Sequence, residues 1–396
     1  MRPPALPRFE GGQRLWMSSA GVGVVGLVAT GVGALLDVRE ALYGYLFGFI
    51  YWLGLCLGTL LLLASFHASN ARWPVVLRRT LEVTGATVPV FLVLFVPVGL
   101  GMARLYPWVT PSPELGEHAL QVLAHREPYN TVPRFLLRAV GYFLAWGLVG
   151  HFLLRWSVRQ DTEGSTRWTA WQRRLGSGAL PVIGLAFSFM TLDWLMALDA
   201  TWQSTVYGIY VYSGATVGAL ALVVVAGVAT RDTQHFGRLL TPGHYQRLGT
   251  LLFAFICFWA YIAYSQYMLI WVASLPEEVT WYLVRMHGGW GAVSWALILG
   301  HFVLPFAVLL SRELKQRPRA LAGVALWMLL LHAVDTAWLV LPALSPSRAH
   351  LPWTALTAWV GVGGCAVAFA VWRSRGMYPV PVGDPFLVHS LQVRQP

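Results

Sequence analysis

The sequence has 396 residues, of which 57% are hydrophobic, 14% are aromatic and only 11% are charged. Soluble chains contain roughly 45–50% apolar and about 25% charged residues. This composition excludes a water-soluble fold of such length and predicts a membrane protein, in contact with lipid.

A net charge of +11 raises the question of nucleic-acid binding. The basic residues are scattered in short loops, which indicates membrane topology and argues against a nucleic-acid partner. The single lysine, Lys315, lies between hydrophobic segments, which excludes a retinal Schiff base. Cys56, Cys257 and Cys365 show no CxxC or CxxCH spacing, so they form no pattern for a disulfide scaffold, a metal site or haem attachment.

Ten charge-poor stretches are long enough to cross a membrane, for which about 20 apolar residues suffice. They occupy 15–36, 41–71, 83–103, 134–157, 179–198, 200–230, 248–276, 286–311, 320–344 and 349–372. The sequence therefore predicts an all-α polytopic membrane protein with about ten transmembrane helices. No small-residue cleavage site follows the first stretch, so we expect a retained helix there.

Lys and Arg are distributed unequally between the two sides of this arrangement. Twenty-one lie at the termini and in loops on one side, six lie in loops on the other side, and Arg138 lies within a span. Because basic residues collect on the cytoplasmic side, both termini and the loops with Arg159 and Lys315 are predicted to be cytoplasmic. The loops with Glu114 and Glu277 are predicted to lie on the opposite side.

Weak internal similarity relates the two halves of the chain. Gly150-His151-Phe152 in the fourth stretch matches Gly300-His301-Phe302 in the eighth, and Asp193 in the fifth corresponds to Asp335 in the ninth. Two four-helix bundles, formed by stretches two to five and six to nine, account for this most simply. Each has an even number of spans, so both share one orientation.

This division gives four parts. They are the N-terminus with the first span, 1–40; the first bundle, 41–199; the second bundle, 200–345; and the tenth span with the C-terminal tail, 346–396.

Ionisable side chains at bilayer depth are costly unless they are paired or hydrated. The central candidates are Asp193 and His151 in the first bundle and His301, His332 and Asp335 in the second. One interpretation is a partial proton path in each bundle, since Asp and His exchange protons near neutral pH. The other is that these groups tie helices together through hydrogen bonds.

The second bundle has further polar residues at helical spacing. His332 and Asp335 are three residues apart and share a helix face. His287 and Ser294 precede His301 at intervals of seven, which predicts one hydrated stripe.

The seventh stretch supplies Tyr261, Tyr264 and Gln266, which we expect to face this stripe. Together these residues make up the predicted second half of the proton path.

His67 and Glu82 lie towards the predicted cytoplasmic side and enter the same path on the functional interpretation. On the structural interpretation they are solvated residues at helix ends, as are Arg138 and His287 near the opposite face. No span carries two histidines at the spacing of a two-haem bundle, which argues against b-type haem in this chain.

About a hundred residues in the middle of the chain resemble a known family. The matching elements are Asp193-Trp194, Trp202, Ser204-Thr205, Tyr207-Gly208, the Phe-Trp-Ala-Tyr run 258–261, Ser265-Gln266-Tyr267 and Pro276-Glu277-Glu278. Together they resemble the second NrfD-like membrane subunit, of ActF type, of alternative complex III. This is a bacterial quinol:cytochrome c (or cupredoxin) oxidoreductase, and the ten spans are similar to polysulfide-reductase-type membrane subunits. Ala200 and Thr201 stand where the family usually has Pro-His, so the role of that histidine is absent.

The resemblance implies a multi-pass subunit of a respiratory complex in the bacterial inner membrane. Its implied partners are a sister NrfD-like subunit that takes most of the quinol chemistry, an iron–sulfur subunit and c-type cytochrome subunits. Haem and iron–sulfur clusters would belong to those partners, and this chain would hold no redox centre of its own. Contact of this chain with menaquinone is compatible with its place in such a complex. Anchoring of partners and proton half-channels are the roles implied for it.

Two alternatives remain. Repeats around a polar midplane also suit a stand-alone secondary transporter. Such transporters break corresponding helices in both halves, whereas Pro89 and Pro97 interrupt the third stretch and no proline lies within 248–275. The other alternative is a structural anchor in which no buried group exchanges a proton.

Overall fold

The computed structural model describes residues 6–113, 115–233 and 235–393, so Glu114 of the topology prediction lies outside the described residues. All regular elements in these ranges are helices, and ten spans among them are long and apolar enough to cross a membrane. The chain is an all-α polytopic membrane protein, which confirms the prediction from composition.

The spans correspond one to one to the predicted stretches, although the third begins at Val75 instead of 83 and the fifth begins at Thr166 instead of 179. They are α1 (Gln13–Leu36), α2 (Val38–Ala68), the consecutive α3 (Val75–Gly85), α4 (Val88–Leu94) and α5 (Val96–Leu100), α8 (Val132–Glu163), α9 (Thr166–Trp194) with η1 (Met196–Leu198), α10 (Tyr207–Ala229), α11 (Pro242–Ala273), α13 (Gly288–Ala296) with the π-helix η3 (Leu297–Val303) and α14 (Leu304–Leu309), α16 (Pro318–Val340) with η4 (Leu341–Ala343), and α17 (Trp353–Ser374). The shorter helices are α6 (Met102–Leu105), α7 (Glu117–Arg126), η2 (Phe236–Leu239), α12 (Pro276–Met286), α15 (Arg312–Gln316) and α18 (Leu387–Leu391).

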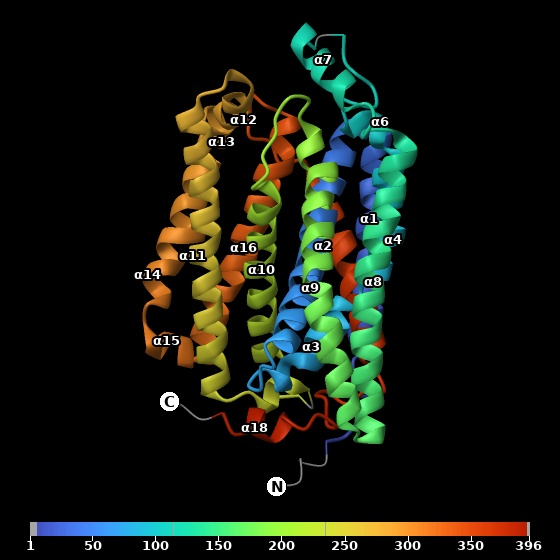
Figure 1. The fold of residues 1–396 in the computed structure, drawn as a ribbon, viewed down its shortest axis with the longest axis vertical. Coiled ribbons are helices and arrows are strands. Elements are labelled where there is room, and N and C mark those ends of the chain that lie inside the picture. Colours follow the sequence, from blue (N-terminus) through green and yellow to red (C-terminus); the bar gives the residue numbers. More distant parts are fainter. Residues whose placement is uncertain (1–5, 114, 234, 394–396) are drawn as a thin grey trace.

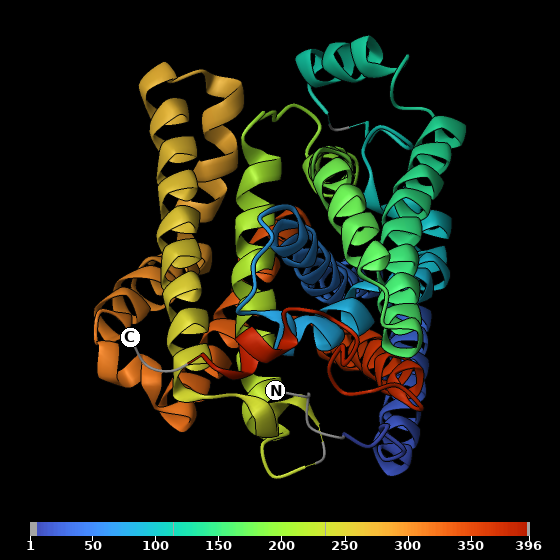
Figure 2. The same ribbon diagram turned by 60° about the horizontal axis from the view of Figure 1, so that its bottom comes forward.

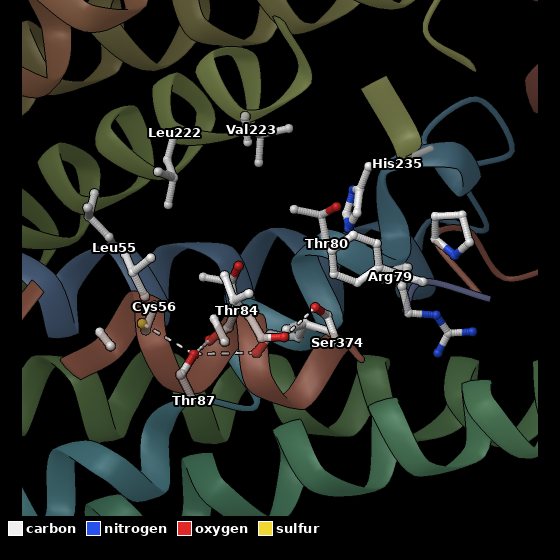
Figure 3. A pocket seen from close by; sticks show the side chains of 18 of the residues that line it. Leu55, Cys56, Arg79, Thr80, Thr84, Thr87, Leu222, Val223, His235 and Ser374 are labelled. Atoms are coloured by element: carbon white, nitrogen blue, oxygen red, sulfur yellow. Dashed lines mark hydrogen bonds between the residues drawn. The ribbon is translucent and has the colours of Figure 1, made fainter. Parts of the chain in front are cut away.

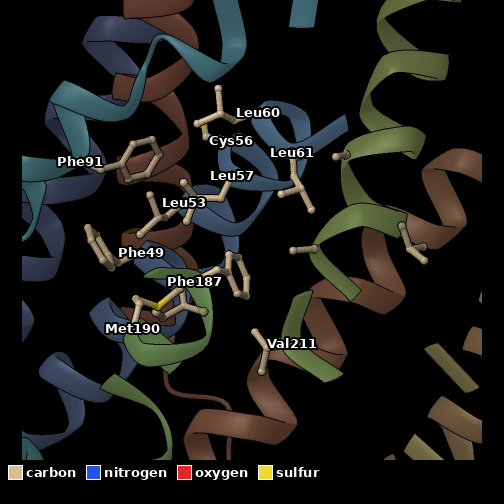
Figure 4. Packing of buried hydrophobic residues seen from close by; sticks show 14 of the residues in the cluster. Phe49, Leu53, Cys56, Leu57, Leu60, Leu61, Phe91, Phe187, Met190 and Val211 are labelled. Carbon is tan, nitrogen blue, oxygen red and sulfur yellow. The ribbon is translucent and has the colours of Figure 1, made fainter. Parts of the chain in front are cut away.

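The helix α2 forms the centre of the molecule. Of its membrane-length segment, 94% is buried, far more than in any outer span. It packs against α9 and α3 on one side, α10 and α16 on another, and α17 on a third. Figure 4 shows its apolar residues Phe49, Leu53 and Leu57 in the core with Phe91 of α4 and Phe187 of α9.

The other spans form groups around α2 (Figures 1 and 2). Within residues 38–198, α8 packs on α9 and α4, and α9 packs on α2. Within residues 207–343, α10 packs on α11 and α16, and α11 packs on α14. The two groups meet where α2 contacts α10.

The first and last spans pair with each other and lie against α2. Glycine makes their close approach possible, because a Cβ on Gly26 would lie 2.7 Å from the Gly361 Cα. Larger side chains at this crossing would separate the two helices.

The loops gather at two opposite ends of the bundle, which we call the α7 end and the α18 end (Figure 1). The helices α7 and α12 lie at the α7 end, and α15 and α18 lie at the α18 end. Because the number of crossings is even, the start of α1 and the end of α17 lie at the same end of the bundle.

Candidate functional site

Asp193, in the last turn of α9, is held by a clamp from α8. Its carboxylate accepts hydrogen bonds from Arg138 Nε at 2.8 Å, from Arg138 Nη2 at 2.9 Å and from the Tyr142 hydroxyl at 2.7 Å. The guanidinium also lies over the Tyr129 ring, 3.8 Å from its centroid. A bidentate, charge-assisted contact of this kind fixes geometry, which favours the interpretation that Asp193 ties α9 to α8. Arg138 is therefore an ion-pair partner and not a solvated end residue.

Asp335, on α16, has a different environment. Its side chain is buried and accepts a hydrogen bond from the Tyr210 hydroxyl of α10. Among the residues that the structure describes, no Arg, Lys or His forms an ion pair with it. A buried carboxyl group without a cationic partner is the arrangement expected where a proton is bound and released.

His332 lies beside Asp335 on the same face of α16, as the spacing predicts. A Cβ on Gly214 of α10 would lie 3.1 Å from Asp335 Oδ2 and 3.4 Å from His332 Nδ1, so both groups line one spot. The imidazole packs 5.3 Å from the Tyr51 ring, and its Nδ1 has no hydrogen-bond partner in the described chain. The predicted pair is thus close together without a direct hydrogen bond.

His301 approaches the same region from the eighth span. It is fully buried within the π-helix η3, and its ring lies 4.1 Å from that of Trp259 on α11. Trp259 in turn packs 5.8 Å from Tyr210, which donates to Asp335. Both nitrogens of His301 are without a hydrogen-bond partner among the described residues. These aromatic contacts place His301, Tyr210, His332 and Asp335 around one interior site, which we call the second-bundle site.

The π-helix has an identifiable cause. Pro305 lies four residues after His301 and has no N–H to give to the His301 carbonyl. The carbonyl of the preceding residue, Gly300, accepts a hydrogen bond from Trp327 Nε1 at 2.8 Å. A π-turn adds a residue to the helix and rotates the next turns about the axis, which disturbs the seven-residue stripe.

The stripe predicted from His287 through Ser294 to His301 is therefore wrong. His287 is exposed and contacts its own helix, since its Nδ1 lies 2.8 Å from the Leu283 carbonyl. Ser294 donates to the Arg285 carbonyl at 2.6 Å and accepts from Trp338 at 2.8 Å. Only His301 of the three reaches the interior site.

The prediction that Tyr261 and Tyr264 face this site is also wrong. They are 65% and 63% exposed, on the outer face of α11. Both lie on the side of α11 opposite Trp259 and Gln266, which are buried. Gln266 does point inwards, and its Oε1 has no hydrogen-bond partner among the described residues.

His151 does not join a path in the first bundle. The regular helix α8 directs Gly150 inwards, where a Cβ would lie 2.8 Å from the Gly85 carbonyl oxygen. The next residue consequently points outwards, and His151 is exposed beside Phe152. The prediction that His151 lies in the interior of the first bundle is therefore wrong.

His67 and Glu82 are buried near the α18 end, so their interpretation as solvated end residues is wrong. The helix α3 begins earlier than predicted and carries Arg78, Arg79 and Glu82 into the protein. Arg79 Nη1 lies 3.1 Å from Glu82 Oε2, and its Nη2 pairs with Asp161. Such a network neutralises most of the charge that it buries.

The C-terminal tail completes this cluster. Asp384 forms a buried ion pair with Arg78, and the Gly383 amide donates to Asp161 at 3.2 Å. Ser390 donates to the Trp73 carbonyl at 2.6 Å. The tail therefore fastens the start of α3 at the α18 end.

Arg285 of α12 closes the second bundle at the α7 end. Its guanidinium donates at 3.1 Å to the carbonyls of Trp281, Trp338 and Leu339. The last two carbonyls belong to the final turn of α16, which has no intrahelical donors for them. Burial lowers the pKa of Arg285 to about 10, which leaves it charged at neutral pH.

Sequence reasoning missed Tyr210, Tyr142 and the role of Arg138. Tyr210, Gly214 and Gly218 are spaced by four, so a hydroxyl and two small residues line one face of α10. That pattern, with Asp335 on a polar face of its own, was the available signal for the Tyr210 contact. Pro305 was the signal for the π-helix.

Within the described ranges, no three His, Cys, Asp or Glu side chains are grouped so as to hold a metal ion. No protein-family model matches this sequence, and no curated protein matches it either. The ten spans define a multi-pass α-helical membrane protein with a buried carboxyl group in each half.

Proposed function

We propose that this chain is an integral membrane subunit of a quinol-oxidising respiratory complex, and that its second bundle binds and releases protons. The family resemblance of the central hundred residues supports the first part. The geometry around Asp335 supports the second part.

The observation that carries the proton role is the buried carboxyl group of Asp335, which has no ion-pair partner among the described residues. It lies with Tyr210 and His332 at one spot, and His301 is joined to them through Trp259. Groups that exchange protons near neutral pH are suited to a relay when they lie within reach of each other or of bridging water. The clamp of Asp193 by Arg138 favours an anchoring role for the first bundle.

The proposed orientation puts the α18 end in the cytoplasm of a bacterial cell. Its support is the excess of Lys and Arg in the loops of that end. In a variant without its native cysteines, a cysteine at Arg159 or Lys315 should react with an impermeant maleimide from the cytoplasmic side only. A cysteine at Glu127, next to α7, should react from the other side, and the reverse pattern would overturn the orientation.

Membership of a complex is tested by purification in a mild detergent. The expected result is co-elution of a sister membrane subunit, an iron–sulfur subunit and c-type cytochromes, identified by mass spectrometry. Recovery of the chain alone would contradict this proposal and favour a stand-alone transporter.

Asp335→Asn tests the proton role. The amide retains the shape and accepts the Tyr210 hydrogen bond but carries no exchangeable acid proton. In vesicles containing the purified complex, we expect a lower ratio of protons translocated to electrons transferred, with quinol oxidation retained. Asp193→Asn is the control for the loss of a buried carboxylate; it loses the ion pair with Arg138 and should be less stable, but it should leave the ratio unchanged. An unchanged ratio in Asp335→Asn would remove that residue from the path.

A further inference from the structure

A separate cavity of about 220 Å³ lies towards the α18 end, between α2, α3, α10 and α17. Most of its wall is apolar and comes from residues such as Leu55, Leu222, Val223 and Val367. Figure 3 shows Cys56 and Thr87 at one end of this hollow, and Thr80 and His235 at the other. None of its lining residues belongs to the second-bundle site, although Leu55 of its wall and His332 of that site both lie beside Gly218.

The cavity is long and narrow. On α17 it extends from Ala366 to Ser374, which is about 12 Å at about 1.5 Å per residue. A cavity of roughly 150 Å³ accommodates one benzene molecule. The volume and length together therefore suit one hydrocarbon chain or a small ring system with a short tail.

One wall carries uncharged polar groups. Thr80, Thr84 and Thr87 recur at intervals of four and three along the third span and face the cavity. At its outer end, Thr80 Oγ1 and His235 Nδ1 are buried and have no hydrogen-bond partner among the described residues. Buried polar atoms without partners are costly, so a ligand with oxygen atoms at this end would satisfy them.

The charge at the outer end argues against an anionic ligand. Arg79 lines the cavity, but its guanidinium is already paired with Asp161 and lies 3.1 Å from Glu82. Two carboxylates for one guanidinium leave no free positive charge for a phosphate. An uncharged head fits this electrostatic environment.

We propose that the cavity binds one uncharged amphiphile, with its apolar part between α10 and α17 and a hydroxyl or carbonyl oxygen at Thr80 and His235. Neutral lipids such as a monoacylglycerol and isoprenoid quinones share this chemistry. The binding is structural or regulatory, since the site is separate from the second-bundle carboxyl group.

The test uses the full-length chain, purified in detergent and freed of lipid. Three probes are added in turn: monoolein, a decyl-substituted naphthoquinone and dioleoylphosphatidylglycerol. A ligand that binds the folded state raises the melting temperature in a saturable way. We expect this for at least one uncharged probe and not for the anionic lipid, and the probe that binds more tightly identifies the source.

Two variants and one control variant locate the binding. Ala226→Phe fills the cavity and should abolish the shift, whereas Ala229→Phe, on the exposed side of the same helix, should keep it. Thr80→Val retains the shape and should weaken the affinity about tenfold, the effect of losing one hydrogen bond. This variant decides the matter if Ala226→Phe does not fold.

Three outcomes would overturn the proposal. They are no shift with either uncharged probe, an equal shift in Ala226→Phe and the unmodified chain, or stronger binding of the anionic lipid. Unaltered affinity in Thr80→Val would remove the polar end of the site.

Discussion

The two groups of spans place related residues in opposite environments. Asp193 is clamped by an arginine, whereas Asp335 accepts a hydrogen bond from a tyrosine and has no ion-pair partner in the described chain. His151 is exposed on an outer face, whereas His301 is fully buried. Sequence similarity between the two halves therefore does not extend to the chemistry of their interiors.

A local backbone difference explains the histidines. The fourth residue after His151 is Arg155, whose N–H continues the regular helix α8, while the fourth residue after His301 is Pro305. The proline favours a π-turn, and the inserted residue changes which side chains face inwards.

Arg138→Ala should have the largest effect on stability. It leaves the buried Asp193 carboxylate without its guanidinium. Removal of one partner from a fully buried ion pair costs about 3–5 kcal/mol, and we expect the lower end of this range because the Arg138 side chain is partly exposed. Thermal unfolding in detergent, followed by circular dichroism, measures the loss. Arg134→Ala, at an exposed position on the same helix, is the control and should change little. Equal stability of the two variants would show that the clamp does not hold the first bundle together.

Gly218→Ala tests a close contact of α10 with α2 and α16. A Cβ there would lie 2.5 Å from Leu55 Cδ2 and 2.8 Å from His332 Cδ2, so the side chains must move. Overpacking of this kind costs about 1–3 kcal/mol. Gly147→Ala in α8 is the matched control, because its Cβ would meet no atom within 4 Å. The same unfolding experiment compares them, and a neutral Gly218→Ala would mean that α10 and α16 are less tightly packed than the structure has them.

The sequence predicted the spans well because hydrophobic length is a property of each segment by itself. The bounds of α1 and α17 depend on where charges and turns occur, and those are visible in the sequence. The start of α3 was harder to predict. Arg78 and Arg79 look like loop residues until Asp384 and Asp161, more than 80 positions away along the chain, provide their partners.

The candidate site was predictable only in part, for the same reason. Spacing placed His332 and Asp335 together, since three residues on a helix define a shared face. Spacing does not determine which face of α11 is buried. The prediction therefore placed Tyr261 and Tyr264 in the interior and did not include Trp259. The choice between these faces depends on the packing of α11 against α10 and α14, which no single segment encodes.

His301→Phe and His151→Phe form the pair with the smallest expected effect on stability. Phenylalanine keeps nearly the ring volume of histidine and its contact with Trp259, and His301 has no hydrogen bond to lose among the described residues. The free energy of unfolding of His301→Phe should therefore differ from that of the unmodified chain by no more than roughly 0.5 kcal/mol, as for a surface substitution. His151→Phe should likewise be neutral because its side chain is exposed.

The two variants should separate in the proton measurement. A phenyl ring carries no exchangeable proton, so His301→Phe should lower the proton-to-electron ratio of the reconstituted complex, whereas His151→Phe should leave it unchanged. If both ratios are unchanged while Asp335→Asn lowers its own, protons reach Asp335 without passing His301. If His301→Phe instead unfolds the protein, water-mediated hydrogen bonds hold that imidazole in place, and its role is structural like that of Arg138 in the first bundle.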